Sequence, residues 1–141
     1  MIFTLGLLAS IILMVLSLLH IHWAIGGTYG FENSLPTDLN GNCVLNPTKI
    51  DSAIVGIGLL MFALIFLVKS SVLLLQLPMF VMNYALWLII AIFFLRAMGD
   101  FKFVGFFKKI KTTEFAKMDT KFYTPLCLLL SLMGLIIEFK G

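Results

Sequence analysis

Charge is the property that this sequence has least of. Only 12% of its 141 residues are Asp, Glu, Lys or Arg, and residues 1–31 contain none of them. Soluble domains carry about 25% charged and about 45–50% apolar residues, whereas 61% of this chain is hydrophobic. A domain of this size leaves much of its surface exposed and cannot bury so many apolar side chains. The composition excludes a soluble globular domain and predicts that most of the chain lies in lipid.

Motifs of the common enzyme classes are also missing. The sequence contains no P-loop, no Rossmann glycine pattern and no nucleophile elbow. The two cysteines, Cys43 and Cys127, form no CxxC pair, which argues against a thiol–disulfide relay. A net charge of only +3 argues against nucleic acid as a partner. Whether the protein is an enzyme therefore stays open, and no cofactor is indicated.

Four apolar runs come close to the length of about 20 residues that a helix needs to cross roughly 30 Å of hydrocarbon. They predict helices at Ile2–Ile25, Ser52–Val68, Pro78–Ala97 and Pro125–Phe139. The first run lacks a basic flank and is too long for a signal peptide, so we expect a retained helix. A tight turn should join the second and third helices, and Thr124 should cap the fourth. The predicted fold is all-α: a single domain, residues 1–141, that forms a polytopic four-transmembrane-helix bundle.

Basic residues are distributed unevenly around these helices. Eight of the ten Lys and Arg residues lie in or beside the connecting segments Gly26–Ile50 and Met98–Phe122, which share one side of the membrane. Because cytoplasmic loops carry the excess of Lys and Arg, we expect both segments in the cytoplasm and both termini outside it. A composition rich in Lys, Ile, Phe and Asn is typical of AT-rich bacterial genomes, which favours the bacterial inner membrane.

The segment Phe101–Lys111 mixes phenylalanines with lysines and has two interpretations. In the first interpretation it is a basic amphipathic interfacial helix that rests on anionic headgroups of the lipid bilayer. Its surface contacts would then be Lys102, Lys108, Lys109 and Lys111. A plain positive-inside anchor requires only the charges, and we favour this second interpretation.

Polar side chains gather at one membrane face in this topology. They lie at the end of the first helix, at the end of the third and just before the fourth: His20, His22, Trp23, Arg96, Asp100, Asp119 and Tyr123. Ionisable groups inside a membrane are costly and often functional, so this set is a candidate ligand-binding site. Arg96 and Asp100 are four residues apart and can pair on one helix face. A purely structural ion pair at the water boundary is the alternative.

A metal site is not predicted at this face. His20 and His22 are two residues apart, which separates them by about 200° around a regular helix, so they cannot share one ion. A catalytic zinc also needs a third protein ligand, and no spacing in the sequence supplies one. A hydrogen-bonded pair of interfacial histidines is the preferred interpretation.

Several longer patterns carry a resemblance. They are His20-x-His22-Trp23-Ala24-x-Gly26-Gly27, Leu35-Pro36-Thr37, Arg96-Ala97-x-Gly99-Asp100-Phe101, and Phe103-Val104-Gly105-Phe106-Phe107-Lys108 followed by Phe115-Ala116, Asp119-Thr120, Tyr123 and Pro125-Leu126-Cys127. With these patterns the chain resembles an uncharacterised family of small bacterial membrane proteins, domain of unknown function 3995. The resemblance spans nearly the whole chain and implies a four-helix membrane protein. It implies no activity.

The polar set predicts a pocket for a small anionic or lipid-headgroup ligand, with Arg96 holding the anion and the histidines exchanging protons. A membrane enzyme with a histidine as general base is a variant of this hypothesis. One alternative is a non-enzymatic accessory or structural subunit that docks on a membrane protein partner. Another is a transporter or channel subunit, which would have to form a homo-oligomer because Asn83 is the one strongly polar side chain deep in a run.

Overall fold

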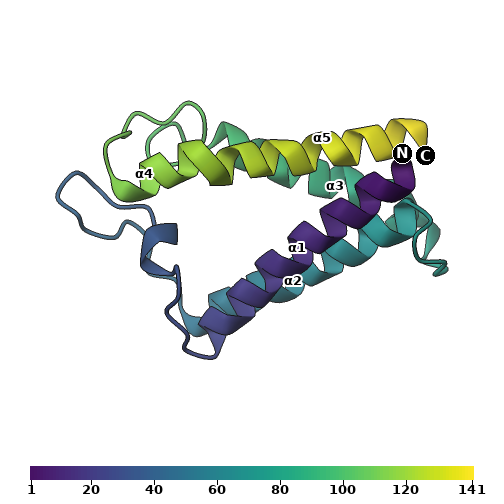
Figure 1. Ribbon diagram of the computed structural model, residues 1–141, viewed down its shortest axis with the longest axis horizontal. Helices are drawn as coiled ribbons and strands as arrows, with labels where there is room; N and C mark the ends of the chain where they lie inside the picture. The colour runs from purple at the N-terminus through teal and green to yellow at the C-terminus, as the bar shows by residue number, and fades with distance from the viewer.

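Helices make up most of the chain, and the computed structural model describes all of it, residues 1–141. The long helical stretches are α1 (Ile2–Ala24), α2 (Lys49–Lys69), α3 (Met79–Met98) and a continuous run of α4 (Glu114–Met118), the π-helical turn η2 (Asp119–Tyr123) and α5 (Thr124–Lys140) (Figure 1). A short 3₁₀ helix, η1 (Glu32–Ser34), lies in the first loop, residues 25–48. The third loop, residues 99–113, joins α3 to α4. Each of the four stretches is long and apolar enough to span a membrane, which confirms the predicted four-helix, multi-pass fold.

The helices form two antiparallel pairs. Helix α1 packs along α2, and α3 packs along α5, with less contact between the pairs than within them. The pairs lie close together at the end that holds both termini and spread apart toward the opposite end (Figure 1). We call this opposite end the wide end. The first loop lies across it, so the outline of the molecule is a triangle with the first loop as its short side.

Small residues let the paired helices approach closely. Ser10 Oγ donates a hydrogen bond to the Ala63 carbonyl oxygen at 3.0 Å, and Ser17 Oγ donates to the Gly56 carbonyl oxygen at 2.6 Å. In the other pair, Ser131 Oγ donates to the Ile90 carbonyl oxygen at 3.2 Å. Small and hydroxyl side chains are typical of helix contacts in lipid, where van der Waals packing and hydrogen bonds replace the hydrophobic effect.

The apolar core lies between and within the pairs, and apolar side chains also cover the outside. Buried core residues come from all four stretches, among them Leu13, Phe66, Leu86, Ile89 and Leu130. Large apolar side chains on the outer faces, such as Leu18, Ile54 and Leu88, are exposed. A soluble protein does not expose apolar faces of this extent. These faces fit contact with acyl chains.

An ion pair fastens the narrow end. Lys69 Nζ lies 2.8 Å from Glu138 Oε2 and donates a hydrogen bond to the Met82 carbonyl oxygen at 2.9 Å, which ties together α2, α3 and α5. Nearby Asn83 is exposed on the outside of α3 and makes no side-chain hydrogen bond. It lies in the second turn of α3, close to this polar level.

Two local expectations were wrong, and so was the less favoured of the two interpretations of Phe101–Lys111. The fourth helix begins at Glu114, so Thr124 lies inside a continuous helix and caps nothing; Thr113 Oγ1 is the cap and accepts a hydrogen bond from the Ala116 amide. Pro125 is tolerated because it directly follows the wider π-helical turn, which relieves the clash that proline causes in a regular helix. Nine residues, 70–78, join α2 to α3 in place of a tight turn. The third loop is irregular and contains no interfacial helix.

Candidate functional site

A cavity of about 650 Å³ lies at the wide end between the two helix pairs. Its walls come from α1, α2, the first loop, the end of α3 and the π-helical turn, and they include Leu16, Leu19, His20, Trp23, Tyr29, Phe31, Ser34, Asp51, Val55, Arg96 and Tyr123. Apolar surface makes up most of the wall, and the charged side chains in it are those of Asp51 and Arg96. A size of about 300–1,000 Å³ with a small number of polar groups is typical of ligand pockets.

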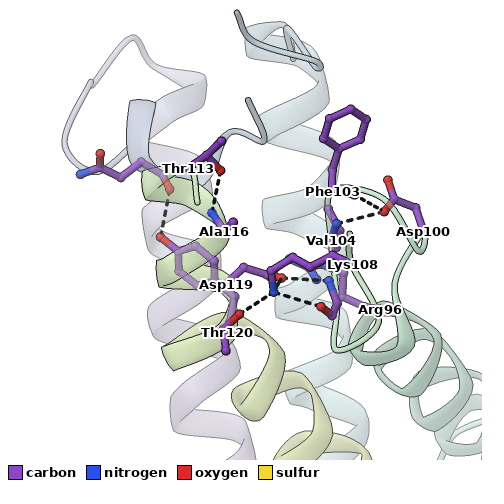
Figure 2. A network of polar contacts seen from close by, with 12 residues as sticks. Arg96, Asp100, Phe103, Val104, Lys108, Thr113, Ala116, Asp119 and Thr120 are labelled. Carbon is purple, nitrogen blue, oxygen red and sulfur yellow. Dashed lines mark hydrogen bonds and ion pairs between the residues drawn. The ribbon is translucent and has the colours of Figure 1, made fainter. Parts of the chain in front are cut away.

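Arg96 occupies one wall of this cavity, where the last turn of α3 places it. Its Nη2 atom donates a hydrogen bond to Asp119 Oδ1 at 2.9 Å, and the Asp119 carboxylate is fully buried (Figure 2). Its Nη1 atom is buried and has no hydrogen-bond partner. A buried donor of a charged group that has no partner carries a desolvation penalty, and this atom is one of three buried side-chain polar atoms that make no hydrogen bond.

The π-helical turn η2 places the carboxylate. Asp119 is its first residue, and Tyr123 is its last. One π-helical turn inserts an extra residue into the hydrogen-bond ladder, and such turns are frequent at functional sites. Here the turn lets α5 pack on α3 while Asp119 points toward the end of α3 and the third loop (Figure 2).

The second oxygen of Asp119 binds the third loop. Oδ2 accepts a hydrogen bond from the Gly105 amide at 2.8 Å and lies 3.1 Å from Lys108 Nζ. Lys108 Nζ also donates to the Gly105 carbonyl oxygen at 3.0 Å and to Thr120 Oγ1 at 2.6 Å, so the ammonium group has three acceptors (Figure 2). We call Arg96, Gly105, Lys108, Asp119 and Thr120 the Asp119 network.

The Asp119 network carries more positive than negative charge. Two cations, Arg96 and Lys108, share the single carboxylate of Asp119, which leaves a surplus of one positive charge. Lys108 is enclosed by protein, whereas the Arg96 side chain is 34% exposed and faces the cavity. The surplus is therefore available at Arg96.

Asp100 does not pair with Arg96. Helix α3 ends at Met98, and Gly99 follows with φ +83°, so Asp100 leaves the helix face on which the two would have met. Its Oδ1 accepts hydrogen bonds from the amides of Lys102 at 2.9 Å, Phe103 at 2.7 Å and Val104 at 2.9 Å. Partial burial raises the pKa of the Asp100 carboxyl, but these three hydrogen bonds outweigh burial and hold the pKa below its ordinary value. Asp100 organises the third loop.

The two histidines separate, as the helical spacing predicts. His20 lines the cavity, where its Nδ1 is 2.8 Å from the Leu16 carbonyl oxygen and its ring lies 4.8 Å from that of Trp23. With Nδ1 on the carbonyl, Nε2 is left for other partners. His22 is exposed and its ring lies against Gly27, outside the cavity. No group of three metal-binding side chains occurs in the structure.

Two hydrogen bonds hold the first loop across the cavity. Trp23 Nε1 donates to the Tyr29 carbonyl oxygen at 2.8 Å, and the Tyr123 hydroxyl donates to the Asn33 carbonyl oxygen at 3.5 Å. The first contact comes from the α1–α2 pair and the second from the α3–α5 pair. The first loop thus connects the two walls and supplies Phe31 and Ser34 to the lining.

The structure brings part of the predicted set together. His20, Trp23, Arg96 and Tyr123 line one cavity, and Asp119 lies behind Arg96, while His22 and Asp100 lie elsewhere. Lys102, Lys109 and Lys111 are exposed, as a surface role requires. Lys108 was predicted to be a surface group as well, but it is buried, with 3% exposure. Sequence reasoning missed Lys108, Thr120 and the Gly105 amide as partners of Asp119. Nothing local distinguishes Lys108 from Lys109, because only the path of the third loop turns one inward.

Comparison with known proteins gives a family without an assigned activity. No curated protein and no solved structure is detectably similar to the chain. The family model described as Protein of unknown function (DUF3995) matches residues 13–134, which include every residue of the cavity wall and of the Asp119 network. This multi-pass membrane protein therefore belongs to the DUF3995 family of proteins of unknown function.

Proposed function

We propose that the protein binds an amphipathic membrane ligand in the wide-end cavity and holds the anionic headgroup of that ligand at Arg96. The observation that carries the proposal is the surplus positive charge of the Asp119 network, which reaches the cavity at the Arg96 side chain, 34% of which is exposed. An anion at the exposed part of Arg96 would balance this charge. Arginine is well suited to this role because its planar fork matches phosphate and carboxylate.

The apolar wall supports a ligand with a hydrocarbon part. Leu16 and Leu19 on α1 and Val55 on α2 line the cavity. The pairs that form the cavity cross the membrane, so an acyl chain can lie between them without leaving an apolar environment. A small hydrophilic anion would leave this wall without a partner. We therefore infer a lipid-like ligand rather than a free ion.

The other polar groups of the lining suit a headgroup. His20 offers Nε2 for a hydrogen bond, and Tyr123 offers its hydroxyl oxygen as an acceptor. The excess of Lys and Arg around this end supports a place at the cytoplasmic face of a bacterial inner membrane. Neither group needs to perform chemistry for the site to bind, so the proposal is a binding function.

Trp23 provides the reporter for a test. It lies on the cavity wall and is 9% exposed, so annular lipid reaches it poorly, while Trp87 packs against Phe139 and can be removed as Trp87→Phe. Full-length Trp87→Phe protein in detergent is titrated with phosphatidylglycerol that carries brominated acyl chains, which quench nearby tryptophan. Saturable quenching is expected. Brominated diacylglycerol has the same chains without the phosphate, and it should bind more weakly.

Variants decide whether Arg96 holds the headgroup. Arg96→Gln should weaken phosphatidylglycerol binding at least about tenfold, since a hydrogen bond to a charged group contributes about 1.5–3 kcal/mol. Lys117→Gln is the matched control, because it removes an exposed lysine that pairs with Glu114 away from the cavity. Val55→Phe keeps Arg96 and narrows the cavity, so it should also weaken quenching. Equal binding by Arg96→Gln, or by diacylglycerol, would refute the proposal and favour the accessory-subunit hypothesis.

A further inference from the structure

The third loop has inverted polarity. Its Lys108 is 3% exposed, while Phe101 and Phe107 are each 57% exposed and Phe106 is 45% exposed. In a loop that faces water, lysine belongs outside and phenylalanine inside. Here a cation is enclosed and three large aromatic side chains face outward. The surroundings of the loop are therefore expected to be apolar on at least part of its surface.

This exposure does not come from a loose backbone. Asp100 Oδ1 binds three successive amides, and the Phe106 amide donates to the Ala97 carbonyl oxygen at 2.9 Å. Gly99 and Gly105 have φ +83° and +90°, and their backbones touch so closely that a Cβ on either would overlap the other strand of the loop. With Lys108 and Gly105 bound to Asp119, the path of the loop is fixed from both ends. The outward phenylalanines are a consequence of that path.

The outer surface also carries ordered combinations of aromatic and basic side chains. The rings of Phe101 and Phe107 lie 6.1 Å apart, so they form one apolar projection. Lys102 Nζ lies 5.0 Å from the centre of the Phe103 ring, and Lys102, Lys109 and Lys111 are all exposed. Aromatic side chains with basic neighbours are characteristic of the headgroup region, where rings enter the acyl boundary and ammonium groups meet phosphates.

The position of the loop points to the same partner. It begins one residue after the last turn of α3, a membrane-spanning helix, and it returns directly into the helix that crosses back. It must therefore lie at the level where the hydrocarbon ends. A large exposed apolar patch at that level would promote aggregation in water, but it contributes favourably to binding when it enters the bilayer.

We infer that the third loop is a folded membrane-anchoring element that inserts the Phe101–Phe107 pair into the leaflet at the wide end and gathers anionic lipids with Lys102, Lys109 and Lys111. Its occupant is the surface of the bilayer itself. This function is separate from ligand binding in the cavity, since none of these side chains lines it. The buried Lys108 is the internal brace of the element and takes no part in lipid contact.

The test places a single tryptophan at the proposed insertion point of the full-length protein. In a Trp23→Phe/Trp87→Phe background, Phe107→Trp is reconstituted in vesicles of phosphatidylcholine and phosphatidylglycerol. We expect blue-shifted emission, little quenching by aqueous iodide, and stronger quenching by lipids brominated near the headgroup than by lipids brominated near the chain end. Phe101→Trp, whose ring neighbours Phe107, should behave alike. Leu39→Trp, in an exposed part of the first loop, is the water-facing control and should show red emission and iodide quenching.

The charge of the loop is tested in the same protein. At equal mole fractions, brominated phosphatidylglycerol should quench Phe107→Trp more than brominated phosphatidylcholine does. Replacement of Lys102, Lys109 and Lys111 by Gln should remove that difference while the emission stays blue. Iodide access equal to that of Leu39→Trp would overturn the inference. Blue emission without quenching by any brominated lipid would overturn it in favour of a protein partner on this surface.

Discussion

Lys108 and Asp119, eleven residues apart in the sequence, form an ion pair in which both side chains are buried, with Nζ and Oδ2 3.1 Å apart. Asp119 also binds Arg96 through its other oxygen, so one carboxylate joins the end of α3, the third loop and the π-helical turn. The attraction among these groups offsets the desolvation of the buried charges only while all the partners are present. This gives the site a structural dependence on a single side chain.

Removal of that carboxylate should be among the most destabilising single changes. Asp119→Ala leaves two cations without their carboxylate partner, one of them enclosed by protein, and should lower the free energy of unfolding by about 3–5 kcal/mol. Lys117→Ala breaks an exposed pair with Glu114 instead and should change it by less than about 1 kcal/mol. Thermal or denaturant unfolding in detergent, followed by circular dichroism, measures both. Equal stability of the two variants would contradict the ion-pair assignment.

The glycine at position 105 should tolerate no side chain. Its φ of +90° disfavours other residues, and a Cβ would collide with the Met98 carbonyl oxygen and with Gly99. Gly105→Ala should therefore cost at least about 1–3 kcal/mol, the usual range for a strained backbone conformation. Gly58→Ala is the matched control, because Gly58 lies in α2 with open space around it, and alanine there should stabilise by about 0.5–1 kcal/mol. In the same unfolding assay, Gly105→Ala should lower the free energy of unfolding and Gly58→Ala should raise it.

Acid should remove the contribution of Asp100. Its pKa in the folded protein lies below the ordinary value, so the charged carboxylate stabilises the fold above the unfolded pKa of about 3.9, and this stabilisation is lost as the pH falls through the lower folded value. The wild type should be more stable than Asp100→Asn at neutral pH, and the difference should shrink below about pH 4. Unfolding curves between neutral and acid pH measure it. A difference that persists unchanged into acid would exclude ionisation of Asp100 as its cause.

Cys43 can report the orientation of the chain. It is exposed in the first loop, which the distribution of basic residues assigns to the cytoplasm. A membrane-impermeant maleimide should fail to label it in intact cells and should label it after permeabilisation. Cys127 is only partly exposed, so a Cys127→Ser variant isolates the signal. Rapid labelling in intact cells would invert the topology and place the wide end outside.

Most of the architecture could be predicted from hydropathy, because an apolar run of sufficient length has few alternatives to a spanning helix. The errors arose where polar residues continue a helix. Residues 114–123 contain two acidic and two basic residues and read as a loop, yet they form the first turns of the fourth stretch, since Thr113 caps them and the apolar part extends them.

The candidate site could be predicted only in part. The topology places the ends of α1 and α3 and the start of the fourth stretch at one face, so the convergence of His20, Arg96 and Tyr123 follows from the order of helices alone. The partner of Arg96 could not be predicted in this way. Arg96 and Asp100 are four residues apart and would lie on one helix face only if the helix continued to Asp100. The φ of Gly99 ends it, and that conformation depends on the contact with Gly105, six residues ahead.

The π-helical turn sets a limit on changes in chain length. The turn already accommodates one extra residue, so a further one-residue insertion between Asp119 and Tyr123 would rotate everything before it by about 100° relative to α5. Helix α5 is fixed by its packing on α3, so the rotation would fall on α4 and carry Asp119 away from Arg96. The first loop has no helical repeat to preserve between Asp38 and Pro47, where most residues are exposed. Insertions should therefore be tolerated on one side of the cavity and prohibited on the other.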